Sequence, residues 1–462
     1  MLNKTIFMYI FCIFSVLLLI SNLLGSSIVL KSKNESLFLD SSDLDKLSYY
    51  NLKNWTIMYY MAVNNKYSNK TYEYLEKLTK IGSNDYINIV VFRDGKGKSD
   101  TNVYYVEKNN LIDIGASYGW PNEVDSSSPE VLKKFCNDII ADYKANHYAL
   151  FIMSPGFGWQ GLCPDFQNFS YFNFNKYMVD MEELKCALQN ITFNGTRKID
   201  IISFNMCLTS MIEVAYEIST YVNYMIASEA DNAPMFVWPN EKIIEKLLIN
   251  PNIETEQIVN DVVDSISPVY YKMHSPFGIF LNNLPFPMLH TVAIRTSLVG
   301  IDLNKIQQIT KSLEEFTIYL INNIHKYKSF IRESRNLVRT FGGWDSRYHI
   351  LVPYYEHLLA LNIFAYDDYV DLYDFIRLIN ITIDDSYLKN KCIKLMNDIK
   401  NATIQINKLD GDHSYGLSIY FPRHRRFFNK PLYGLKLSLP YEKISFSKNT
   451  AWDKFLNKYL EI

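Results

Sequence analysis

The chain has 462 residues, is 48% hydrophobic and carries a formal net charge of −2. This length allows a large buried core, in one big domain or in two fused ones. Because neither sign of charge dominates, the composition does not indicate binding to nucleic acid or to an acidic membrane surface.

The N-terminus is predicted to be a targeting segment. A lysine precedes an apolar run over 6–20, and the small residues Gly25 and Ser27 suit a signal-peptidase site. The run is long for a signal peptide and slightly short for a transmembrane helix. We therefore interpret 1–27 as a signal peptide, with an uncleaved anchor over 6–24 as the alternative. In both cases the rest of the chain is expected to be secreted or to face the secretory-pathway lumen.

Glycosylation sequons agree with this route and predict a glycoprotein. They begin at Asn34, Asn54, Asn69, Asn168, Asn190, Asn194, Asn380 and Asn401. Once Cys12 has left with the signal, the cysteines that remain are Cys136, Cys163, Cys186, Cys207 and Cys392. An odd number leaves at least one thiol outside any disulfide within the chain. No CxxC or Cys/His cluster has the spacing of a zinc site, so we predict no metal and no other cofactor.

Strands alternate with helices through the first half of the chain. After a polar linker over 28–50, buried strands are predicted over 55–62, 87–92, 148–154, 199–204 and 224–227, with an edge strand over 102–106. Helical spacing predicts helices over 70–80, 129–146, 181–188 and 210–220. This alternation predicts an α/β fold, in which a mostly parallel sheet has helices on both faces.

The second half is predicted to be mainly helical from 305 to 400. A buried strand over 416–422 then returns to the sheet, and a short helix over 452–459 closes the chain.

Two loops at one edge of the predicted sheet carry the candidate chemistry, because functional loops gather beyond the carboxyl ends of parallel strands. One loop begins with Pro155 and Gly156, and the other contains Cys207. Residues 156–161 also fit the GxGxxG pattern of dinucleotide sites, but loop residues follow where a helix should begin. A lone cysteine after a strand is usually a small buried hydrophobe, so the surroundings of Cys207 decide its interpretation.

Those surroundings resemble the clostripain family of cysteine endopeptidases. The family's loop Trp-Asp-His-Gly-Ser-Gly-Trp is similar to residues 153–159, and its nucleophile segment Phe-Asp-Ala-Cys-Leu-Met-Gly is similar to 204–210. The likeness continues, in the same order along the chain, at 55–65, 146–150, 213–217, 227–230, 416–422 and Trp452. It implies a caspase-like fold and a Cys–His dyad that cleaves after basic residues.

The resemblance also implies a division of the chain. A caspase-like peptidase-type domain is expected over 51–300, and a C-terminal α/β region of the same unit over 301–462.

Transferred residue by residue, the resemblance implies that Cys207 is the nucleophile and that Gly156 belongs to the oxyanion hole. Pro155 stands where the family has its histidine, and Asn205 replaces the acidic residue two before the nucleophile. Asp231 is a candidate for binding a basic side chain of a ligand, with an ordinary solvated aspartate as the alternative.

The proline removes the chemistry that a cysteine peptidase needs. An unactivated thiol has a pKa near ~8.5, so only a few per cent is thiolate at neutral pH. No acid is left to protonate the leaving amine, and by analogy with triads lacking a member the loss should be several powers of ten. The nearest histidine in sequence, His147, is expected roughly 26 Å away at the other end of its strand.

We therefore predict a clostripain-like pseudoprotease that binds peptide or protein partners, including ligands with basic residues. A membrane contact is expected only if the N-terminal segment stays uncleaved. The alternative is an active endopeptidase that cleaves after Arg or Lys with a base from elsewhere in the chain. A third hypothesis is a redox or mixed-disulfide role for Cys207.

Overall fold

The structure is a computed structural model. It describes residues 29–32, 35–38, 52–65, 67–165, 178–230, 240–265, 270–273, 292–295, 297–341, 368–408, 412–430 and 437–461. The chain separates into two units, Met1–Lys53 and Asn54–Ile462. In the first unit, β1 (Val29–Ser32) and β2 (Glu35–Phe38) form a short antiparallel hairpin. The predicted signal peptide or anchor over 1–27 lies outside the described residues.

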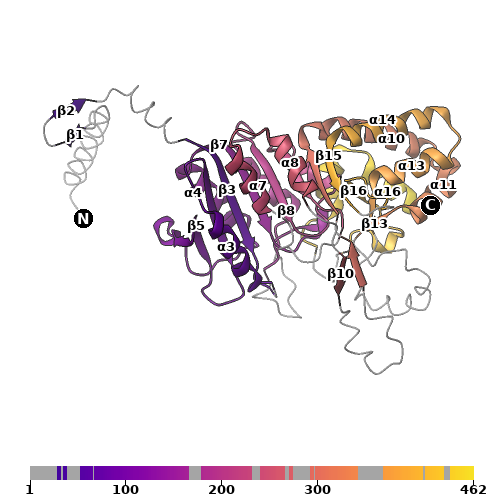
Figure 1. The fold of residues 1–462 in the computed structure, drawn as a ribbon. Helices are drawn as coiled ribbons and strands as arrows, with labels where there is room; N and C mark the ends of the chain where they lie inside the picture. The colour runs from indigo at the N-terminus through magenta and orange to yellow at the C-terminus, as the bar shows by residue number, and fades with distance from the viewer. Residues whose placement is uncertain are drawn as a thin grey trace, which may run out of the picture. The chain divides into compact units, whose positions relative to one another are not determined.

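The second unit is built on a nine-stranded sheet with the order β15-β12-β9-β8-β7-β3-β4-β5-β6 (Figure 1). The strands are β3 (Lys53–Ala62), β4 (Ile87–Asp94), β5 (Asn102–Glu107), β6 (Asn110–Asp113), β7 (Ala145–Met153), β8 (Ile199–Asn205), β9 (Val222–Ala227), β12 (Leu298–Asp302) and β15 (Thr403–Asn407). β3 pairs with β4 in parallel, as do β7 with β8 and β8 with β9. Both margins of the sheet are antiparallel. The predicted mostly parallel sheet is thus confirmed, as part of a mixed sheet.

Helices cover both faces of this sheet. One core contains side chains of α4 (Pro129–Asp142), α5 (Met181–Ile191) and α6 (Ile212–Ile218), and the other contains those of α3 (Lys70–Ile81), α7 (Asn240–Ile249) and α8 (Thr255–Asp264). In β7, Leu150 and Ile152 belong to the first core, whereas Phe151 and Met153 belong to the second. Successive side chains of a strand point to opposite faces, so burial on both sides explains the continuous apolar run in its sequence.

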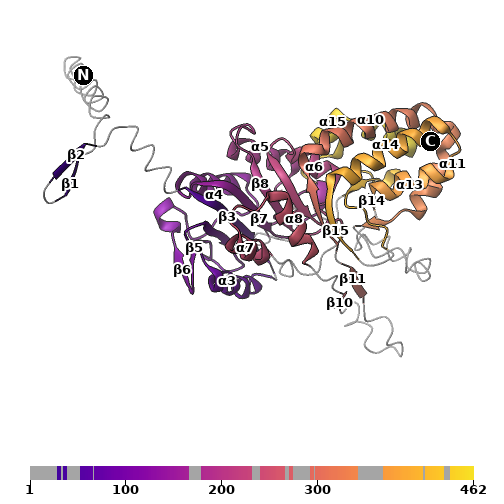
Figure 2. The ribbon, with the colours of Figure 1, turned by 45° about the horizontal axis from the view of Figure 1, so that its top comes forward.

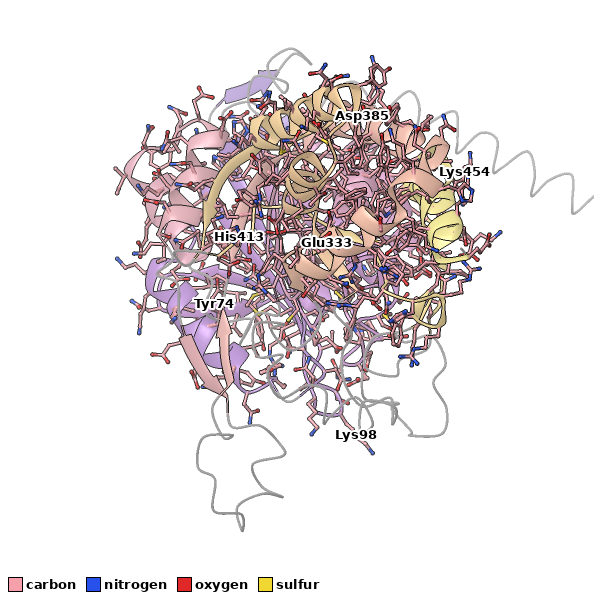
Figure 3. The ribbon with its side chains drawn as sticks, turned by 90° about the vertical axis from the view of Figure 1, so that its right-hand side faces the viewer. Tyr74, Lys98, Glu333, Asp385, His413 and Lys454 are labelled. Carbon is pink, nitrogen blue, oxygen red and sulfur yellow. The ribbon has the colours of Figure 1, made fainter. Side chains whose placement is uncertain are left out.

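The C-terminal region is mainly helical, as predicted (Figures 2 and 3). Its helices are α10 (Ile306–Asn322), α11 (Ile324–Leu337), α13 (Leu372–Thr382), α14 (Ser386–Ala402), α15 (Ser445–Asn449) and α16 (Trp452–Glu461). Figure 3 looks onto this end of the unit, with Asp385 before α14 and Lys454 on α16 labelled.

The strand predicted over 416–422 is present as β16 (Ser418–Tyr420), but its predicted place in the large sheet was wrong. It belongs to a three-stranded sheet with β13 (Thr340–Phe341) and β14 (Tyr369–Asp371). The strands that return to the large sheet are β12 and β15. An apolar run predicts a buried strand. It does not indicate which strand will pair with it, because that pairing depends on distant residues.

The remaining short elements are β10 (Tyr270–Met273) and β11 (Val292–Arg295), which pair with each other, and the 3-10 turns η1 (Gly115–Tyr118), η2 (Gly158–Gln160), η4 (Leu303–Lys305), η6 (Arg425–Phe427) and η8 (Tyr441–Lys443).

Candidate functional site

The two candidate loops leave the same edge of the sheet, side by side. β7 and β8 are parallel neighbours, and Met153 pairs with Asn205, so Pro155 and Cys207 each lie two residues beyond a matched pair. A Cβ atom built on Gly156 would lie 2.7 Å from the carbonyl oxygen of Cys207, which only glycine avoids. The structure therefore brings Pro155, Gly156 and Cys207 together. Asp231 lies outside the described residues.

The turn that carries Cys207 has an uncommon backbone conformation. Leu208 is fully buried and has a φ of 61°, in the left-handed region that bulky side chains rarely adopt. Its N–H donates to the carbonyl of Ala230 at 3.1 Å, and the N–H of Ser210 donates to the carbonyl of Ser228 at 2.9 Å. Such strain persists only where the surrounding structure holds it in place, and it concentrates at functional sites.

Cys207 differs from three of the other cysteines by being partly exposed. Burial raises the pKa of Cys163 and of Cys392 to about 12, and it raises the pKa of Cys136 further still. Those thiols are therefore unsuited to nucleophilic chemistry. Cys186 is exposed on α5, and the described cysteines form no disulfide with one another.

The loop after β7 keeps a fixed shape around Pro155. The carbonyl of Pro155 accepts a hydrogen bond from the N–H of Cys163 at 3.3 Å, and the hydroxyl of Tyr369 donates to the carbonyl of Phe157 at 2.8 Å. Gly158 has a φ of 63° and faces Met211, with no room for a Cβ. Beyond it, Leu162 forms strand bridges with Gly156 and Val179, instead of the helix that a dinucleotide site needs.

His147 lies at the opposite end of β7 from Pro155, as its sequence position predicted. Its Nδ1 atom is 3.1 Å from Oδ1 of Asp200, and its ring stacks on Trp55 with centroids 4.8 Å apart. The hydrogen bond to Asp200 raises the pKa of His147. His325, His413 and His424 are exposed on the C-terminal region. The other histidines, His274, His290, His349 and His357, lie outside the described residues.

Asn205 is fully buried beside the nucleophile position. The hydroxyl of Ser203 donates to its Oδ1 at 3.0 Å, and its Nδ2 is buried with no hydrogen-bond acceptor among the described residues. An amide here carries no charge, so this position does not offer the attraction that a carboxylate gives to a basic side chain.

Two glutamates of the 213–217 motif fasten the nucleophile segment to the C-terminal region. Glu213 accepts hydrogen bonds from the N–H of Tyr420 and from the hydroxyl of Tyr441, each at 2.8 Å. Glu217 accepts one from the N–H of Phe446 at 3.0 Å. Both carboxylates lie on α6, the helix that follows the turn of Cys207. The motif is therefore structural in this protein.

Stability is expected to fall with rising pH through the titration of Glu213. Burial raises its pKa to about 7, against the lowering effect of its hydrogen bonds. A carboxyl with a raised folded-state pKa adds stability below its ordinary pKa of ~4.3, and this stability is lost as the pH rises through about 7. In the wild type, Tm should therefore fall between about pH 5 and about pH 8. Replacing Glu213 by glutamine should reduce this fall, which corresponds to a free energy of unfolding on the order of 1–3 kcal/mol.

Thermal melts of Glu213→Gln and the wild type across that range test this expectation. The surface variant Glu73→Gln on α3 is the control, with a profile like the wild type's. Parallel profiles for the wild type and Glu213→Gln would contradict it.

Sequence reasoning missed Asp371, because no motif surrounds it. The N–H of Gly416 donates to Oε2 of Glu229 at 2.9 Å, and the N–H of Tyr415 donates to Oδ2 of Asp371. Burial raises the pKa of Glu229, and the nearby charge of Asp371 raises it further. Burial also raises the pKa of Asp371 to about 7. Through these hydrogen bonds, Glu229 connects the end of β9 to the segment before β16, and Asp371 connects β14 to the same segment.

Within the described ranges, no group of three or more His, Cys, Asp or Glu side chains is arranged to hold a metal ion. None of the helices described is both long and apolar enough to cross a membrane.

The sequence model of the clostripain family (peptidase family C11) matches residues 59–459. The chain belongs to the clostripain family. The predicted family is thereby confirmed, and the two solved structures described below confirm the predicted caspase-like fold. Clostripain of Hathewaya histolytica is 26% identical over 186 residues, and this match spans 35% of each chain. The matched segment thus covers about a third of the length of that curated relative.

Two solved structures share the fold of this clostripain-family chain. One is an inactive zymogen C11 protease of Parabacteroides distasonis, with a TM-score of 0.56, 15% identity and coverage of 86% of this chain and 98% of its own. The other is a secreted C11 cysteine protease of Bacteroides thetaiotaomicron in complex with an irreversible peptide inhibitor, with a TM-score of 0.53, 15% identity and coverage of 87% and 99%.

Proposed function

We propose that this clostripain-family protein is a pseudoprotease that acts by binding peptide or protein partners. The proposal rests on Pro155, which the sequence resemblance aligns with the family's histidine. This proline directly precedes Gly156, where the carbonyl of Cys207 leaves no room for a Cβ atom. A proline side chain neither accepts nor donates a proton, so it cannot generate the thiolate or protonate a leaving amine.

The preserved scaffold supports binding as the remaining function. The hydrogen bond from Tyr369 to Phe157 and those accepted by Glu213 hold both loops in place without a dyad. The relative from Bacteroides thetaiotaomicron was solved in complex with an irreversible peptide inhibitor. We propose that this chain also binds a peptide, at the sheet edge that carries Gly156 and Cys207. The family resemblance points to basic side chains, for which Asp231 is the candidate partner.

The wild type and Cys207→Ala decide between a pseudoprotease and an enzyme. With Arg-site and Lys-site fluorogenic peptides, we expect the two proteins to give the same background rate. Turnover by the wild type that Cys207→Ala abolishes would instead establish the alternative, an endopeptidase with a base from elsewhere. An uncleavable Arg peptide with a fluorescent label should bind to both proteins, and its failure to bind either would overturn the binding role.

The proposal places the protein in the secretory route, as a secreted or lumenal glycoprotein. Four sequon asparagines are exposed, namely Asn69, Asn190, Asn194 and Asn401. N-glycosidase treatment of the purified secreted protein should increase its electrophoretic mobility. Unchanged mobility, with residues 1–27 still present in the intact mass, would contradict a cleaved, glycosylated form.

A further inference from the structure

The segment that follows β16 is strongly basic and lies beside the candidate site. Residues 423–430 contain Arg423, Arg425, Arg426 and Lys430 and no acidic residue, in a chain whose net charge is −2. Arg425 and Arg426 are exposed. We call residues 423–430 the basic segment.

The two exposed arginines are held in place by aromatic rings rather than by carboxylates. The guanidinium of Arg425 lies 4.9 Å from the ring centroid of Phe428, and that of Arg426 lies 4.7 Å from that of Phe427. Arg425 also donates to Oδ1 of Asn457. In the part of the chain that the structure describes, neither arginine forms an ion pair with a carboxylate. Neither guanidinium is therefore paired directly with a carboxylate of the described chain, and Arg426 also has no hydrogen-bond acceptor among the described residues.

Two acidic side chains close to the basic segment, Glu442 and Asp453, accept hydrogen bonds from asparagines. Glu442 accepts a hydrogen bond from Asn429 at 2.7 Å, and Asp453 accepts one from Asn457 at 3.1 Å. Burial raises the pKa of Asp453, and so does the charge of Glu442, whereas the charges of Arg425 and Lys454 lower it. Lys454 on α16 adds another exposed cation to this neighbourhood (Figure 3).

The backbone of the basic segment is fixed to the loop that carries Gly156. Nε2 of Gln160 donates to the carbonyl of Lys430 at 3.0 Å. The hydroxyl of Tyr420 donates to the carbonyl of Phe427 at 3.1 Å and accepts from the N–H of Asn429 at 3.0 Å. The ring of Tyr420 packs in turn on Trp159, with centroids 5.0 Å apart. A ligand on the basic segment would thus lie next to the candidate site.

We propose that the basic segment is a docking surface for an acidic peptide segment of a partner protein. Guanidinium groups present planar pairs of N–H donors that match a carboxylate, and a side chain already stacked on a ring loses little freedom on binding. The few cations and the negative net charge do not favour a nucleic acid, whose binding relies on many phosphate contacts. Basic clusters that bind membranes lie next to a transmembrane helix or on an amphipathic helix, whereas the basic segment is a loop with one short 3-10 turn. The proposal adds a second surface to the proposed function and does not depend on it.

Fluorescence anisotropy with fluorescein-labelled hexaglutamate tests the proposal on the purified protein. We expect the wild type to bind this probe, with an affinity that falls as salt is added. The double variant Arg425→Gln/Arg426→Gln should bind about tenfold more weakly, because two charge-assisted contacts are lost. Lys77→Gln/Lys80→Gln on α3 is the matched control, since it removes the same charge from exposed lysines that already face Glu241 and Glu76.

Several outcomes would overturn the proposal. One is the absence of probe binding to the wild-type protein at about 100 µM protein. Another is equal binding by the Arg425→Gln/Arg426→Gln variant, with an unchanged Tm. Tighter binding of a heparin-derived tetrasaccharide or of anionic vesicles would assign the surface to those ligands instead. Cys207→Ala should bind hexaglutamate like the wild type, so failure at this surface is distinguishable from failure at the candidate site.

Discussion

Replacing Pro155 by histidine is expected to give the protein a peptidase activity that depends on Cys207. The position directly precedes Gly156, where the carbonyl of Cys207 leaves no room for a Cβ atom, so an imidazole at 155 would start from the correct edge of the sheet. A paired imidazole can take the thiol proton and later protonate the leaving amine. The side chain at 155 is only partly buried, so the larger residue has solvent on one side.

The expected gain is about 10²–10⁴-fold in kcat/KM over the wild type, which is the usual contribution of a positioned acid–base group. Fluorogenic peptides with Arg, Lys or Gln before the scissile bond would measure it. Because Asp231 is the candidate partner for a basic side chain, Arg and Lys should exceed Gln in Pro155→His and by less in Pro155→His/Asp231→Asn.

Pro155→His both removes the proline ring and adds a base. Pro155→Ala separates these two effects, since it removes the ring without adding a base. It should remain as inactive as the wild type. Activity in Pro155→Ala, or activity in Pro155→His/Cys207→Ala, would mean that the histidine is not the missing partner of the thiol. No gain in a Pro155→His protein with an unchanged Tm would show that the site has lost more than its base.

Removing the indole of Trp452 is expected to destabilise the protein by about 3–5 kcal/mol, the range for truncating a buried tryptophan. Trp452 is fully buried, packs on Phe421 and Phe455, and donates from Nε1 to the carbonyl of Tyr420 at 2.8 Å. Tyr420 is the residue against which Trp159 of the site loop packs. The damage should therefore reach the candidate site from a helix more than 200 residues away in sequence.

Urea unfolding and peptide binding would measure both effects in Trp452→Ala. Phe193→Ala is the control, because this ring is 61% exposed and its loss should change the stability by less than about 0.5 kcal/mol. If Trp452→Ala unfolded at the same urea concentration as the wild type, the closing helix would not support the site as described.

The sequence predicted correctly those elements that depend on a local pattern of apolar residues. The apolar run of β7 and the helical spacing of α4 are local, and both elements form close to their predicted positions. The placement of Pro155, Gly156 and Cys207 at one edge could be predicted, because loops at the carboxyl ends of parallel strands gather at the same edge of a sheet. Asp371 and Tyr369 escaped notice because each acts on a residue more than 100 positions away. The sheet that β16 joins was mistaken for the same reason, since partner choice depends on the packing of distant segments.

The hydrogen bonds between distant parts of the chain limit how early in synthesis the candidate site can fold. The hydroxyl of Ser418 donates to the carbonyl of Ser210 across 208 residues, and β15 closes the sheet beside β12. Contacts of such long range form slowly, because the intervening chain must first be made and ordered. The segment around Cys207 therefore gains its final support only after Tyr441 and Phe446, which donate to Glu213 and Glu217, have been synthesised. Until then the nascent protein must keep an unfinished sheet edge from pairing with other chains.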